Sequence, residues 1–174
     1  AVHQAAFVTG CSQAILRDAK RYGVPPAKQR VVFNGIDWQE FSGAAKAHKQ
    51  KYIFTLGRLS PVKGFDLLIT AFARIAKKHP DLSLHVGGTG TEQPALLLLV
   101  KKLRIEKQVV FLGSLDRRQT VSAMRGSLFV VVPSRYDAFG IVAAEALAAG
   151  KAVVATTHGG PPEFFWKKNV RSNF

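Results

Sequence analysis

The sequence predicts an α/β fold, a Rossmann-like open parallel sheet with helices on both faces. Short apolar runs rich in β-branched and aromatic residues recur along the chain, and segments of helical period separate them. Strands that are apolar throughout are typical of parallel sheets, which are buried on both faces. Alternation of strand and helix indicates βαβ units. We therefore expect one Rossmann-like half.

Length and composition narrow the possible classes of protein. The chain has 174 residues and a formal net charge of +14, and this length predicts one domain, or one domain with a fragment of another. The single cysteine, Cys11, excludes an internal disulfide and a multi-cysteine zinc site and favours a cytoplasmic location. The apolar runs are far shorter than the about 20 residues of a membrane span. A start at Ala1 without methionine predicts a piece of a longer protein.

The strands of the main sheet are expected after residue 50. Residues 1–42 are predicted to be the remnant of a preceding domain, residues 43–50 a polar linker, and residues 51–174 the main domain. Five apolar segments, each closed by a turn residue, are the predicted strands: Tyr52–Gly57, Leu82–Gly87, Gln108–Gly113, Leu128–Pro133 and Ala152–Thr156.

Helices are expected between these strands. Apolar residues recur at helical spacing within residues 68–75 and again within residues 96–103. Asp116 is a predicted N-cap for a third helix. A fourth helix is expected over residues 140–149, ended by Gly150.

The loops that follow the strands are the predicted ligand edge, because ligands bind open parallel sheets beyond the carboxyl ends of the strands. These loops contain two glycine clusters, at residues 57–64 and 87–90. They also contain the side chains Arg58, Lys63, Arg135, Asp137 and His158, of which a loop histidine is most simply structural or solvated.

Neither glycine cluster is a known nucleotide motif. The dinucleotide fingerprint fails at Gln93, where a third glycine is required, and Lys63 is not followed by Ser or Thr as in a P-loop. For residues 87–90 a tight turn and a close approach to a ligand remain equal alternatives.

Two cations flank the turn after the first strand. Arg58 and Lys63 lie at the start of a helix, where positive charge is unfavourable unless an anion lies between them. A diphosphate would supply that anion, since arginine bridges two oxygens and lysine acts as a point charge. The alternative is two solvated charges on a basic surface.

Two acids accompany the fourth helix. Glu145 lies in an otherwise apolar segment, so its carboxylate should be partly buried and need partners. Asp137 precedes the helix, whose first amides, from Phe139 to Ile141, would face a docked anion. Hydroxyl acceptors beside a diphosphate indicate a nucleotide sugar. The alternatives are a structural salt bridge for Glu145 and a helix-capping or loop carboxylate for Asp137.

Several motifs follow one another in a fixed order: Gly57-Arg58-Leu59, Lys63-Gly64-Phe65-Asp66, Pro133-Ser134, Asp137-x-Phe139-Gly140, Glu145-Ala146, Ala149-Gly150, and Gly159-Gly160 with Glu163. Together they resemble the donor domain of the group 1 (family 4) retaining glycosyltransferases over most of residues 51–165. That resemblance implies the C-terminal half of the two-domain GT-B fold. Upstream, Phe7-Val8-Thr9 with Ser12, and Asn34-Gly35-Ile36-Asp37 with Phe41, resemble the family's crossover from the N-terminal acceptor domain.

The resemblance implies roles for individual residues. Arg58 and Lys63 would hold the donor diphosphate, Glu145 would bind ribose hydroxyls, and Asp137 would contact the donor sugar; these four are the candidate catalytic residues. The further candidate donor-binding residues are Gly57, Gly88, Leu115 at the base pocket, Phe139, Gly140, Ile141 and Val142. Asp137 departs from the family, because it is one methylene shorter than the usual glutamate.

The expected function is therefore that of a donor domain. It would bind a nucleotide-diphosphate sugar for retaining transfer, with no metal or other cofactor. Because the acceptor domain and its histidine are missing from this chain, we expect it to transfer no sugar by itself. A non-catalytic nucleotide-binding or regulatory module is the alternative. Nucleic-acid binding rests on charge alone and is not expected, while peripheral contact with the inner face of a membrane remains open, since many relatives glycosylate lipids there.

Overall fold

The computed structural model describes residues 4–41 and 51–165, so the predicted linker at residues 43–50 lies outside the described residues. Its main feature is a five-stranded, fully parallel sheet of order β5-β4-β3-β6-β7. The strands are β3 (Lys51–Leu56), β4 (Leu82–Gly87), β5 (Val109–Gly113), β6 (Val130–Val132) and β7 (Val153–Ala155). All five predicted strands are confirmed, with shorter ends in β6 and β7.

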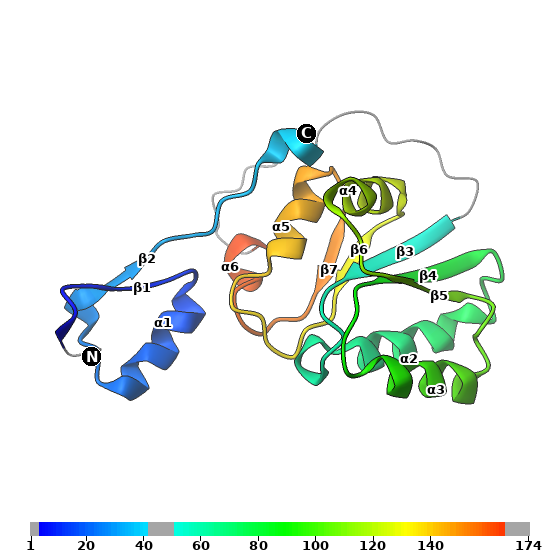
Figure 1. The fold of residues 1–174 in the computed structure, drawn as a ribbon, viewed down its shortest axis with the longest axis horizontal. Coiled ribbons are helices and arrows are strands. Elements are labelled where there is room, and N and C mark those ends of the chain that lie inside the picture. Colours follow the sequence, from blue (N-terminus) through cyan, green and yellow to red (C-terminus); the bar gives the residue numbers. More distant parts are fainter. Residues whose placement is uncertain (1–3, 42–50, 166–174) are drawn as a thin grey trace.

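Helices cover both faces of this sheet. In Figure 1, α2 (Phe65–Ala76) and α3 (Gln93–Leu103) lie on one face, and α4 (Arg117–Gly126) and α5 (Ile141–Ala148) lie on the other. A one-turn η5 (Pro61–Lys63) precedes α2, and the short α6 (Pro162–Phe165) follows β7. The predicted α/β class is thereby confirmed. No helix among the described residues is long and apolar enough to cross a membrane.

Local signals in the sequence set the ends of these helices. The predicted N-cap, Asp116, accepts a hydrogen bond from the amide of Gln119 at 2.8 Å, and the Gln119 side chain accepts one from the amide of Asp116 at 2.9 Å. This reciprocal capping box satisfies two amides that the first turn of α4 leaves unpaired. Gly150, with a φ of 70°, ends the α5 region as predicted.

The core has two halves, one on each face of the sheet. The side chains of β3 alternate between them, so that Ile53 packs with α2 and α3 while Phe54 packs with α4 and α5. Buried apolar residues of β4 and β6, such as Leu84 and Val130, complete the two halves. The core therefore fixes the sheet on which the strand-to-helix loops stand.

The N-terminal segment forms a small βαβ unit beside the sheet (Figure 1). Parallel strands β1 (Val8–Gly10) and β2 (Gln29–Val31) flank α1 (Gln13–Ala19), with one-turn helices η2 (Lys20–Tyr22) and η3 (Pro26–Lys28) between α1 and β2. An extended segment then leads to η4 (Trp38–Phe41), which packs against α4 and α5. The division into a remnant and a main domain agrees with the two separate sheets but is not tested further.

Candidate functional site

The candidate site lies where the strand order reverses, between the neighbouring strands β3 and β6. The chain leaves β3 toward α2 and leaves β6 toward α5, so the loops of residues 57–64 and 133–140 emerge side by side. The amide of Arg135 donates to the carbonyl of Val62 at 2.8 Å. Such a switch point is where ligands bind open α/β sheets.

Glycine allows the two loops to approach at backbone distance. Gly64 has a φ of 65°, and a Cβ built on it would lie 2.1 Å from the carbonyl oxygen of Pro133. A side chain there would therefore push the loops apart. The loop after β7 joins them, since the amide of Gly160 donates to the carbonyl of Asp137 at 2.7 Å.

Lys63 and Asp137, two of the candidate catalytic residues, form an ion pair across the switch point. The Lys63 Nζ lies 2.5 Å from Asp137 Oδ2, and both side chains are partly buried. The structure thus brings together two residues that are far apart in the sequence and that the loop pattern placed on one edge.

The rest of the Asp137 carboxylate accepts hydrogen bonds from its own loop. Oδ1 accepts hydrogen bonds from the amides of Phe139 at 3.3 Å and Gly140 at 2.9 Å, and Oδ2 accepts one from Ser134 Oγ at 3.4 Å. Burial by itself raises the pKa of Asp137, but the Lys63 ammonium and these amides outweigh it and hold the pKa below its ordinary value. Asp137 is therefore a loop carboxylate rather than a helix cap, because α5 begins at Ile141 and its N-cap, Gly140, has no side-chain cap; its predicted contact with a sugar stays a prediction.

Of the amides from Phe139 to Val142 that were expected to face the donor, the last two remain open for an anion. Phe139 and Gly140 donate to Asp137, whereas within the described part of the chain no acceptor takes a hydrogen bond from the amides of Ile141 and Val142. These two begin α5, where free amides and the helix dipole favour a negative charge. Gly140 and Phe139 therefore shape the site, and Ile141 and Val142 present its donors.

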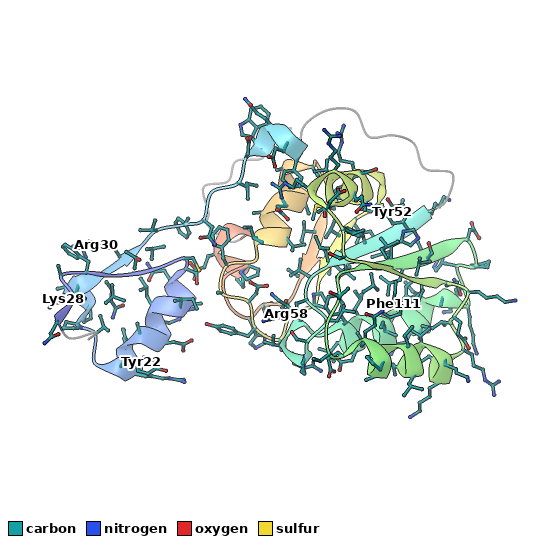
Figure 2. All side chains as sticks on the ribbon, in the orientation of Figure 1. Tyr22, Lys28, Arg30, Tyr52, Arg58 and Phe111 are labelled. Carbon is teal, nitrogen blue, oxygen red and sulfur yellow. The ribbon has the colours of Figure 1, made fainter. Side chains whose placement is uncertain are left out.

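The two arginines of this edge differ in their partners. Arg135 makes a two-pronged pair with Asp66, at 2.8 and 2.6 Å, and donates to the carbonyl of Pro61 at 2.7 Å. The Arg135 guanidinium lowers the pKa of Asp66. Arg58 is exposed, and its side chain makes no ion pair or hydrogen bond with another described residue. Figure 2 shows Arg58 at the edge where the loops gather, so it is the arginine that an incoming anion can meet.

Glu145, inside α5, is buried and paired with a residue that the sequence did not single out. Its Oε1 accepts a hydrogen bond from Nη1 of Arg117, and the glutamate is only 7% exposed. Arg117 Nε also lies 2.6 Å from Glu40 Oε2, and its guanidinium stacks over the Phe41 ring at 4.3 Å. Burial alone lowers the pKa of Arg117, but the two glutamates outweigh it and raise that pKa. The salt-bridge interpretation of Glu145 is confirmed.

The glycine cluster after β4 packs against the loop after β3. A Cβ on Gly88 would lie 2.0 Å from the carbonyl oxygen of Gly57. The amide of Gly57 in turn donates a hydrogen bond to the carbonyl of Gly87 at 3.1 Å. Close backbone packing thus accounts for Gly88, and a contact of Gly57 or Gly88 with a donor stays a prediction.

Two further candidates lie away from the ion pair at the switch point. Leu115 follows β5 and lines a hollow on the α4 side of the sheet together with Tyr52 and His85. His158 is exposed and lines a separate hollow between α1 and the loop after β7. Among the described residues no three histidine, cysteine or acidic side chains gather as metal ligands would, and the expected independence from metal stays a prediction.

With the site described, comparison with known proteins identifies the family. Residues 37–170, more than half of the chain, match the family "Glycosyl transferases group 1". The chain belongs to this family. The predicted resemblance is confirmed, and the five-stranded parallel sheet corresponds to the C-terminal domains of GT-B glycosyltransferases.

Individual relatives give the extent of the match. Glycogen synthase of Mycobacterium tuberculosis is 33% identical over 141 residues, covering 80% of this chain and 34% of the relative. The structure of Anabaena HepE in complex with UDP and glucose superposes with a TM-score of 0.82 at 26% identity, covering 93% of this chain and 47% of HepE. The C-terminal domain of the group 1 glycosyl transferase LpcC from Francisella tularensis gives 0.67 at 32% identity, covering 74% of each chain. The chain thus spans about a third of the length of the curated relatives it matches.

Proposed function

We propose that this chain is the donor-binding part of a retaining glycosyltransferase and holds a nucleoside-diphosphate sugar at the switch point between β3 and β6. The observation that carries the proposal is the arrangement of cationic and amide donors there. Lys63 is held across the two loops by Asp137, Arg58 is unpaired among the described residues, and the free amides of Ile141 and Val142 begin α5. A diphosphate is the anion that matches two cations and a helix N-terminus.

The nucleoside then extends along α5 and toward α4. Glu145 lies one helical turn beyond Ile141, where it would accept hydrogen bonds from the ribose hydroxyls. Its partner Arg117 is two residues beyond Leu115, so the Arg117 contact brings the end of β5 beside the ribose position. Leu115 would then line the base pocket. The UDP and glucose bound by the similar HepE support a donor of this class.

In the proposed reaction these groups stabilise the departing nucleoside diphosphate. Negative charge develops on the leaving diphosphate as the sugar bond breaks, and donors aimed at that position lower the barrier. Arg58, Lys63 and the two amides supply this stabilisation without a metal ion. The acceptor would attack from the same face as the leaving group, which retains the configuration. Acceptor-binding groups would come from the part of the relatives' length that this chain does not span, so the chain by itself would transfer no sugar.

Calorimetry with UDP, GDP and ADP tests the proposal. We expect the 174-residue chain to bind at least one of them and the double variant Arg58→Ala/Lys63→Ala to lose the binding. The matched control is Arg74→Ala/Lys78→Ala, which removes one cation from the last turn of α2 and one just after the helix, and this variant should bind as the unchanged chain does. Absence of binding to all three nucleotides, or equal binding by the two double variants, overturns the proposal.

A further inference from the structure

We propose that Arg117 is a positioning residue for nucleotide binding, which fixes one oxygen of the Glu145 carboxylate so that the other is presented to the ribose hydroxyls. The inference rests on the proposed function, since it assigns the group that prepares the ribose subsite. It also gives the segment before the donor domain a part in that subsite, because Glu40 and Phe41 anchor Arg117.

The burial of Glu145 is the first step. Its side chain is 10% exposed, and α5 has no other polar side chain. A carboxylate in such surroundings stays ionised only when a cation or hydrogen-bond donor compensates its lost hydration. Within the described part of the chain that compensation comes from Arg117 alone and reaches only Oε1. Oε2 keeps its lone pairs for another donor.

The position of Arg117 is the second step. It is the first residue of α4, directly after the N-cap, where the helix dipole disfavours a positive charge. A cation there requires a compensating contact, and Arg117 has two carboxylate partners, Glu145 and Glu40. Its placement is therefore explained by the carboxylates rather than by the helix.

The anchoring of Arg117 is the third step. Nε holds Glu40, Nη1 holds Glu145, and the guanidinium plane lies over the ring of Phe41, which is 1% exposed. Three contacts on different parts of one planar group fix its orientation, which a lysine ammonium could reproduce only in part. Because Glu40 and Phe41 belong to η4, the segment that leads into the donor domain holds the guanidinium in place.

The chemical consequence is specific to hydroxyl donors. The cluster of one arginine and two glutamates carries a net charge of −1, so the open oxygen of Glu145 attracts a hydroxyl hydrogen. Without Arg117, no described side chain would hold the Glu145 carboxylate in this orientation. The loss of that orientation removes a ribose acceptor and leaves the diphosphate donors, Arg58, Lys63 and the amides of α5, unaltered.

Calorimetry with UDP and with 2′,3′-dideoxy-UDP separates a positioning role from a structural one. We expect the unchanged chain to prefer UDP by about tenfold, as for hydrogen bonds to a charged acceptor. Arg117→Met should lose this preference by weakening UDP about tenfold while 2′,3′-dideoxy-UDP stays within about twofold. Arg117→Lys should restore part of the preference. Arg74→Met, the same change on an exposed arginine of α2, should alter neither affinity.

Every other outcome counts against the positioning role of Arg117 or against the proposed function itself. An equal weakening of both nucleotides by Arg117→Met, or no weakening of either, overturns the positioning role and leaves the proposed function standing. If the unchanged chain binds none of UDP, GDP and ADP, the proposed function fails and this inference falls with it; if it binds GDP or ADP but not UDP, the same comparison is made with that nucleotide and its 2′,3′-dideoxy form. Should Arg117→Met not fold, as judged by circular dichroism, Glu40→Gln removes only the outer anchor. That variant must still lower the preference for UDP over the dideoxy nucleotide, and an unaltered preference overturns the inference.

Discussion

Asp137, before α5, and Glu145, inside it, have the same charge and opposite surroundings. Asp137, just before the helix, uses both oxygens within its own chain, on two amides, Lys63 and Ser134. Glu145, inside the helix, has one oxygen on Arg117 and the other open. The difference follows from position and length, since a short side chain in the loop before a helix reaches the amides of that loop, here those of Phe139 and Gly140. Asp137 therefore holds the loops and Lys63 in position, whereas one oxygen of Glu145 is available to a ligand.

A second comparison concerns two ion pairs of the same kind that differ in their exposure to solvent. Lys63 and Asp137 form their pair with side chains 27% and 15% exposed, whereas the pair of Arg135 and Asp66 is 43% exposed on both sides. Solvent screens the second pair much more than the first. The stability of the switch point is therefore expected to depend on Asp137 far more than on Asp66.

The largest effect on stability is expected from Asp137→Ala. The variant loses the hydrogen bonds from the amides of Phe139 and Gly140 and leaves the Lys63 ammonium without its partner, so we expect the free energy of unfolding to fall by about 2 to 3 kcal/mol. Glu145→Ala, which leaves Arg117 hydrated and still paired with Glu40, should lower it by less than about 1 kcal/mol. Urea unfolding measures both. Equal losses in the two variants would contradict the division of roles.

The next effect concerns the cations. Lys63→Ala should weaken UDP binding by about tenfold or more, because it removes a charge-assisted contact to the diphosphate. Arg135→Ala should change the affinity by less than about twofold, because Arg135 is engaged by Asp66 rather than by the ligand. Calorimetry on the two single variants measures this contrast, and a stronger loss in Arg135→Ala would place the diphosphate elsewhere.

The pH dependence of stability should single out Asp137 on the acid side. Its pKa in the folded chain is below the ordinary value, so its contribution is fully present above the ordinary pKa and is lost as pH falls through the folded pKa. Asp66 contributes in the same direction. We expect the melting temperature to fall as the pH drops below about 4, and less steeply in Asp137→Asn than in the unchanged chain. Parallel acid profiles for the two chains would count against this.

The smallest effect is expected from Asp66→Ala. Its exposed pair with Arg135 should be worth less than about 1 kcal/mol, so the melting temperature should shift by only a few degrees at most. Differential scanning calorimetry measures this shift beside that of Asp137→Ala. A shift as large as that of Asp137→Ala would show that burial does not separate the two pairs.

Most of the fold could be predicted from local patterns in the sequence. Asp116 and Gln119 lie at the spacing of a capping box, and Gly150 marks the end of α5, so both ends were predictable from neighbours in the chain. The strand predicted at residues 128–133 shortened to Val130–Val132, because periodicity gives the existence of a strand better than its ends. The side-by-side position of Lys63 and Asp137 followed from the topology of parallel sheets.

The partners of the charged residues could not be predicted in the same way. The ion pairs of Arg117 with Glu145 and with Glu40 depend on the packing of η4, α4 and α5 against one another. No local sequence pattern relates residues that lie so far apart in the chain. One signal was present, since an arginine in the first turn of a helix opposes the helix dipole and needs an explanation. The hydrogen bonds from the loop amides to Asp137 were likewise not predictable from the sequence, because the reach of its short side chain depends on the conformation of the loop.

The central claim, a diphosphate site at the start of α5, is tested most directly by titrating the isotope-labelled chain with UDP and following its backbone amide signals by NMR. We expect the largest shifts at Ile141 and Val142 and in the loop of residues 58–63, with little change around Arg74 at the far end of α2. Saturable binding whose shifts centre away from these two segments, or a titration with no shifts, would contradict the claim.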